Sequence, residues 1–151
     1  MFQRQRRQQR ENVGVYLLAM QLLSAGPIPP ITLGAILLQI AVFLGYVPFL
    51  DSDKTKSLCL LPTKIIQNGE WYRLIFPVIM HGSDMHLYYN MISLLYKGKK
   101  LEKKLGSSTF ACILCVFTIA STCMTVAVSS LLDTFVGTEF SRQCAVGFSG
   151  A

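Results

Sequence analysis

The chain has 151 residues, of which 52% are apolar and only 15% are charged, whereas about a quarter of the residues in an average soluble domain are charged. The net charge of +6 would suit a nucleic-acid-binding protein, but the cations concentrate in two clusters, residues 4–10 and 97–104, that flank apolar segments. That placement is typical of membrane proteins. We therefore expect a polytopic, all-α protein in a lipid bilayer and no nucleic-acid partner.

The N-terminal segment, residues 1–27, contains four arginines and then a short apolar run, residues 13–23. We interpret it as a basic cytosolic segment followed by an interfacial helix or by an extension of the first span. A secretory signal is an alternative, although Leu23 and Pro27 make the cleavage sites near Gly26 poor. An Arg-rich transit peptide is a lesser alternative, because Glu11 and the apolar run follow so soon.

Three apolar stretches predict membrane spans. Residues 31–47 carry no charge and follow two prolines, which suit a helix start. A second helix begins after Ser83 or Asp84, either of which can cap it, and runs to Tyr96, just before the lysine cluster. Residues 107–132 are uncharged and form the clearest span, and a further apolar helix begins near residue 146. The expected fold is about three spans plus the start of a fourth.

The two basic clusters also predict the orientation, because positive charge favours the cytosolic side of a membrane. We expect both clusters, and hence the N-terminus, in the cytosol, with two spans between them. The connection 48–83 and the loop 133–145 then lie on the lumenal side. This orientation places the helix that starts near His86 and the helix that starts near Ser149 at the same depth.

His86 and Asn90 stand at i and i+4, on one face of the second helix. They fit either helix–helix hydrogen bonding or donation to the oxyanion that forms when a serine attacks a carbonyl. The candidate nucleophile is Ser149, because Gly147 and Gly150 allow a tight turn at a helix start, where N–H groups are unpaired. An N-cap serine or a small-residue helix contact is the plainer alternative.

Residues before the second helix have simpler interpretations. Trp71 suits an interfacial anchor, and Arg73 suits a hydrogen-bond donor that fixes the loop, although both also fit an ordinary aromatic and basic belt. His81 is expected to make a loop hydrogen bond. Because it is five residues before His86, the two histidines do not share a helix face, and we expect no shared metal.

The five cysteines give no sign of a metal site, because Cys112 and Cys115 have no second pair and no histidine nearby. Cys59 and Cys144 both fall in predicted lumenal loops, where a disulfide is permitted. Two free thiols are nevertheless the favoured expectation, since buried cysteines commonly stay unpaired.

Together these residues resemble rhomboid intramembrane serine proteases over the whole stretch from Trp71 to the chain end. Four motifs occur in the family's order: Glu70-Trp71-Tyr72-Arg73 in the first loop, His81 with His86-x-x-x-Asn90 in the second helix, Gly98-x-x-x-Glu102-x-x-x-Gly106 where that helix closes, and Gly147-Phe148-Ser149-Gly150 around the nucleophile. The chain is most similar to an endoplasmic-reticulum subgroup of the family, which implies an integral protein of that membrane.

The resemblance implies roles for these residues. Ser149 would be the nucleophile, and His86, Asn90 and the Ser149 backbone N–H would form the oxyanion hole. Trp71 and Arg73 would belong to the membrane-embedded first loop. The family uses no metal and no cofactor, and its substrates are transmembrane segments of other proteins.

The resemblance also implies that residues 28–151 are the N-terminal part of a rhomboid domain that is truncated. The family's general base is a histidine two spans beyond the serine, and neither His81 nor His86 matches that position. We therefore expect an intramembrane serine endopeptidase in the parent protein and an inactive chain on its own, because serine is a weak nucleophile without a base. The alternative is a non-catalytic rhomboid-like protein that binds transmembrane clients. The intact motif around Ser149 favours the protease.

Overall fold

The computed structural model describes residues 13–47, 50 and 58–144. Its helices are α2 (Val13–Ser24), α3 (Pro30–Phe43), α5 (Pro62–Asn68), the 3-10 helix η3 (Trp71–Leu74), α6 (Phe76–Ile79), α7 (Asp84–Leu105), α8 (Ser107–Val136) and the 3-10 helix η4 (Phe140–Arg142). The predicted all-α class is confirmed for this part of the chain.

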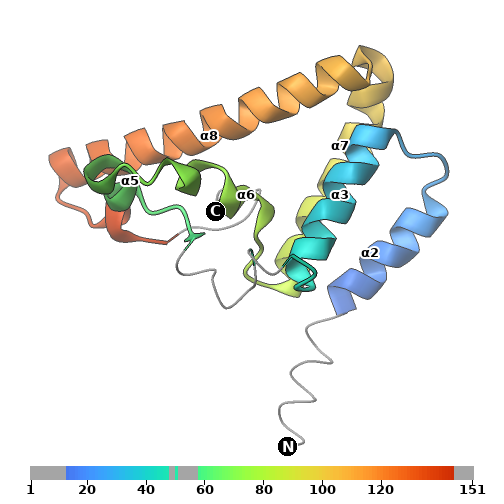
Figure 1. Ribbon diagram of the computed structural model, residues 1–151, viewed down its shortest axis with the longest axis horizontal. Helices are drawn as coiled ribbons and strands as arrows, with labels where there is room; N and C mark the ends of the chain where they lie inside the picture. The colour runs from blue at the N-terminus through green and yellow to red at the C-terminus, as the bar shows by residue number, and fades with distance from the viewer. Residues whose placement is uncertain (1–12, 48–49, 51–57, 145–151) are drawn as a thin grey trace, which may run out of the picture.

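The helices gather at the two ends of α8 (Figure 1). At its start, α8 contacts α7 and α3, and α7 in turn packs along both α2 and α3. At its far end, α8 contacts α5, η3 and η4. Little of α8 is covered by the rest of the described protein, and its buried residues are Phe110 and Thr122.

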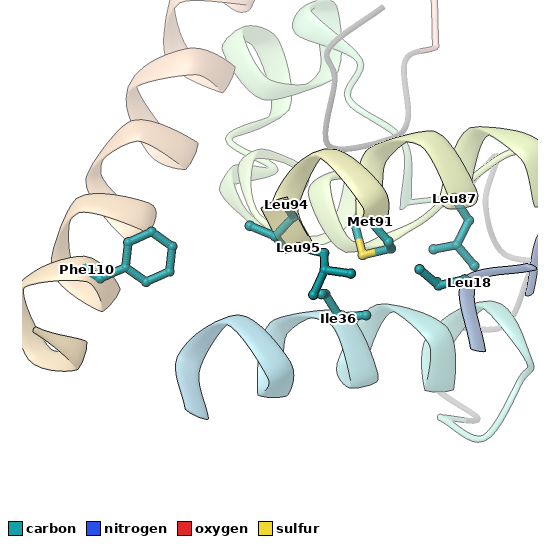
Figure 2. Close-up of a cluster of buried hydrophobic side chains, with 7 residues drawn as sticks. All are labelled: Leu18, Ile36, Leu87, Met91, Leu94, Leu95 and Phe110. Carbon is teal, nitrogen blue, oxygen red and sulfur yellow. The ribbon is translucent and has the colours of Figure 1, made fainter. Parts of the chain in front are cut away.

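One apolar core joins the first group of helices, and Figure 2 shows its side chains. Leu18 of α2 and Ile36 of α3 are fully buried with the α7 residues Leu87 and Met91. The remaining members are Leu94, Leu95 and Phe110. The α7 members recur every three or four residues, so they form one face of that helix. This face fixes the rotation of α7 and thereby the direction in which its polar residues point.

Two buried carboxylates on α7 hold the starts of the neighbouring helices. Asp84 accepts hydrogen bonds from backbone N–H groups at the start of α2, including that of Gly14. Glu102 accepts from the N–H groups of Ile31 and Thr32 at the start of α3, at 2.9 and 2.8 Å. The first N–H groups of a helix have no partner inside it, and a negative charge there also suits the helix dipole. Glu102 of the Gly98-x-x-x-Glu102-x-x-x-Gly106 motif therefore caps the start of α3.

The direction of α2 was not anticipated. It starts beside Asp84, at the beginning of α7, and ends near Lys99, whose ammonium donates to the carbonyl of Ala25. It is thus a separate helix packed parallel to α7 and not an extension of the first span. Its expected position at the membrane interface stays a prediction. Val13 consequently lies at the end of α7 opposite the lysine cluster (Figure 1). Residues 1–12 lie outside the described residues, so the expectation that they share one side of the membrane with residues 97–106 stays a prediction.

Helix boundaries also differ from the predicted ones. The first predicted span ends at Phe43 and not at residue 47. The second helix continues through the lysines to Leu105, because lysine is a good helix former and does not end a helix by itself. The third continues past Asp133 to Val136. Among the described helices, α8 alone is both long and apolar enough to cross a membrane by itself, and α2 and α3 are shorter apolar helices.

Candidate active site

The polar residues of the second-helix motif gather at the start of α7. Ser83 caps the helix, as predicted, by accepting a hydrogen bond from the backbone N–H of His86 at 3.2 Å. His86 and Asn90 follow one turn apart on the same face and are both partly buried. The structure therefore brings the two predicted oxyanion donors together on a rigid helix start.

His81 belongs to the same cluster. Its side chain is only 6% exposed, and Nε2 lies 3.1 Å from Nδ2 of Asn90. Its ring meets that of His86 edge to face, with centroids 5.2 Å apart. The hydrogen bond of this loop histidine thus reaches a side chain on α7, a partner that the sequence did not predict. Sequence spacing could not reveal this contact, since His81 precedes the helix and obeys no helical period.

The protonation of His81 follows from its surroundings. Burial and the neighbouring charge of His86 lower the pKa of His81 from 6.5 to about 4. The ring is therefore neutral near pH 7, and one of its two nitrogens carries a lone pair that can accept a hydrogen bond.

Asn90 also lines a cleft of about 470 Å³ between α7 and α8. The walls are mainly apolar and include Leu94 and Leu101 of α7 and Phe110 and Phe117 of α8. A polar group at the edge of an apolar cleft interacts more strongly with a charge than it does in water. Asn90 is thus a cleft-lining residue that also contacts His81.

The first loop is organised by Arg73, which is only 5% exposed. Its Nη1 donates to the carbonyl of Cys59 at 2.9 Å, and its Nε donates to the Glu70 carboxylate at 2.5 Å. Hydrogen bonds from Arg73 and Tyr72 lower the pKa of Glu70 to about 2. Trp71, in contrast, is 66% exposed, as an interfacial anchor would be.

A disulfide joins this loop to the segment that leads toward Ser149. It links Cys59 to Cys144, so the expectation of two free thiols is wrong. The loops meet because Thr63 donates to the carbonyl of Ser141 at 2.7 Å, while Asp133 accepts from the backbone N–H of Ser141 at 2.9 Å. Two segments far apart in the sequence are thereby placed side by side, which loop composition alone does not indicate.

The predicted nucleophile lies beyond the described part of the chain. Ser149 and its neighbours Gly147 and Gly150 fall within residues 145–151, for which the structure gives no placement. Their roles stay predictions. Cys144, five residues before Ser149, is the last described residue and is covalently tied to the first loop.

Comparison with known proteins identifies the class. Residues 68–151, more than half of the chain, match the rhomboid domain. The chain therefore belongs to the rhomboid family, whose domain is a helical membrane bundle, and it is an integral membrane protein.

Individual relatives refine this assignment. The chain is 39% identical to Rhomboid-related protein 4 of Rattus norvegicus, over 97% of this chain and 46% of that protein. It is 37% identical to Rhomboid-related protein 4 of Homo sapiens over the same shares, and 29% identical to Rhomboid protease GluP of Bacillus subtilis over 82% of this chain and 22% of that protein. The chain thus spans about half the length of the Rhomboid-related proteins that it matches. No solved structure matches it.

Proposed function

We propose that the chain is the N-terminal part of an intramembrane serine endopeptidase that cleaves transmembrane segments of other proteins in the endoplasmic reticulum membrane. Membership of the rhomboid family, in which one similar protein is named a protease, supports this at the level of the class. The observation that carries the proposal is the arrangement on α7, where His86 and Asn90 lie one turn apart and Asn90 borders an apolar cleft.

In the proposed reaction, the hydroxyl oxygen of Ser149 attacks the carbonyl carbon of the scissile peptide. The carbonyl oxygen becomes an oxyanion, which accepts hydrogen bonds from His86, Asn90 and the Ser149 backbone N–H. The serine proton passes to a general base and then to the leaving amine, and water hydrolyses the acyl-enzyme. His81 does not suit the role of base, because its Nε2 is occupied by Asn90.

The first loop would position the enzyme in the bilayer. Trp71 and Ile75 are 66% and 56% exposed, and their apolar side chains suit the membrane interface. Arg73 and the Cys59–Cys144 disulfide join this loop to the segment that precedes Ser149. The loop would thereby hold the nucleophile segment at a defined depth.

The proposal is tested in a chimera that joins residues 1–151 to the C-terminal half of the rat relative. The chimera should cleave a reporter transmembrane substrate, and Ser149→Ala should abolish cleavage because the covalent route is lost. His86→Ala or Asn90→Ala should reduce the rate by about 10²–10³, the usual cost of one oxyanion donor. The unmodified relative serves as the positive control.

The isolated chain gives a second test. Residues 1–151 should insert in membranes, yet a serine-directed fluorophosphonate should label them no more than it labels the Ser149→Ala variant. A correctly inserted, disulfide-bonded chimera that binds the substrate but never cleaves it would favour the alternative, a non-catalytic rhomboid-like protein that binds transmembrane clients.

A further inference from the structure

His81 precedes α7 in the chain, yet it holds a side chain on that helix. Its Nε2 lies 3.1 Å from Nδ2 of Asn90, and the imidazole is almost completely buried. An amide nitrogen can only donate a hydrogen bond, so Nε2 must accept it. A ring that accepts at Nε2 is neutral and carries its proton on Nδ1, and this is the tautomer that the contact as placed requires.

This contact decides which end of the Asn90 amide faces which way. Rotation of the amide by half a turn exchanges its oxygen and nitrogen, and the two orientations are otherwise similar in shape. A lone pair on Nε2 of His81 favours the orientation with the nitrogen toward the ring, whereas an N–H on Nε2 would favour the oxygen. One N–H of Asn90 is then bonded to His81, and the second N–H is left for another acceptor. In the opposite orientation, the amide oxygen would face that acceptor. Both atoms carry negative charge, so they would repel each other.

We propose that His81 is a positioning residue, which holds the amide of Asn90 so that its nitrogen donates to the oxyanion of the transition state. The proposal rests on the proposed protease function. His81 acts only through Asn90 and does not itself touch the substrate.

The surroundings make the positioning rigid. The ring of His81 packs edge to face on the ring of His86, the titratable group in contact with it. Ser83 caps the backbone of His86, and the adjacent Asp84 is fixed by its bonds to the start of α2. The start of α7 and the ring of His81 are thus held together, and preorganised donors are what an oxyanion hole requires.

A spectroscopic test does not depend on activity. Residues 1–151 with ¹⁵N-labelled histidine are placed in detergent micelles at pH 7, and the protonation of each imidazole nitrogen is read from ¹⁵N–¹H correlation spectra. His81→Phe identifies the signals of His81. We expect a neutral ring with the proton on Nδ1, and Asn90→Ala should shift the Nε2 resonance. A proton on Nε2, or a positively charged ring, would overturn the proposal.

A kinetic test uses the active chimera. His81→Phe keeps the ring shape but removes the acceptor, so kcat should fall by about 10–10³ with little change in KM, up to the cost of losing the donor itself. His81→Gln keeps an acceptor oxygen and should recover part of that loss. In an Asn90→Ala background, His81→Phe should cause little further fall in kcat. In the background of the control variant Tyr89→Phe, which changes an exposed residue, His81→Phe should still cause its full fall in kcat.

Additive losses for His81→Phe and Asn90→Ala would also overturn the proposal, because His81 would then act independently of Asn90. An inactive wild-type chimera would instead count against the protease function, and the spectroscopic result would still decide whether His81 orients the amide.

Discussion

The Cys59–Cys144 disulfide should contribute strongly to stability. It joins residues 85 positions apart and encloses α5, α6, α7 and α8. Closing a loop of that length removes conformational entropy from the unfolded chain worth about 4–5 kcal/mol at 25 °C. We expect a smaller loss, about 2–4 kcal/mol, because helices that stay inserted in the membrane already restrict the unfolded chain. The hydrogen bond from Arg73 to the Cys59 carbonyl would remain; a bond from a charged group contributes about 1.5–3 kcal/mol, but it holds Cys59 within the first loop and does not tie that loop to Cys144.

The perturbation is Cys59→Ala or Cys144→Ala, and unfolding is followed by denaturant titration in micelles under non-reducing conditions. Cys123→Ala is the matched control, because Cys123 is a free, exposed cysteine on α8. Limited trypsin digestion supplies a local readout, since the exposed Arg142 lies just before Cys144 and should be cleaved faster once the bridge is lost. Equal stability and equal digestion of both variants and the control, with unchanged non-reducing gel mobility, would refute the reasoning.

Three further predictions concern the helix contacts and the buried histidine. Gly14→Ala should destabilise the protein by about 1–3 kcal/mol, because the added Cβ would lie 2.6 Å from the Asp84 carbonyl oxygen. Gly34→Ala, which meets open space, should be neutral or stabilising, and equal effects in denaturant unfolding would contradict the close approach of α2. Glu102→Ala should cost about 2–4 kcal/mol by leaving the N–H groups at the start of α3 without an acceptor, whereas Glu102→Gln, which keeps one acceptor oxygen, should cost less in the same assay. The lowered pKa means that His81 binds fewer protons in the folded protein than in the unfolded chain. The free energy of unfolding should therefore fall as the pH drops from 6.5 toward about 4, by at most about 3 kcal/mol. A His81→Phe variant with the same pH dependence would show that another group is responsible.

The sequence predicted the helical class, a cap of α7 at Ser83 or Asp84 and the place of His86 and Asn90 on one face of that helix, because these depend on composition and on spacing within one helix. It did not predict contacts between distant segments. His81 lies before the helix, so its bond to Asn90 follows from the fold and not from any period. The disulfide was missed for the same reason, since the bonds that bring its two loops together become visible only in three dimensions.

The separate packing of α2 was missed for a different physical reason. Its apolar run is too short to span a bilayer, so charge counting did not treat it as a separate crossing. Its position is set by the Asp84 carboxylate, which lies about seventy residues away in the sequence. The sequence shows that residue 84 is acidic but not which N–H groups it binds. The single acidic residues at the two ends of α7 therefore fix how α2 and α3 pack against that helix.

Those two carboxylates also have a consequence for the order in which the protein is made. Synthesis proceeds from the N-terminus, so α2 and α3 leave the ribosome first, while Asp84 and Glu102 follow about seventy residues after the N–H groups that they cap. Until α7 arrives, the starts of both helices must find water or lipid headgroups as temporary partners. The helices α2 and α3 are thus completed late although they emerge before α7, and a nascent chain arrested before α7 should be a preferred client of membrane chaperones.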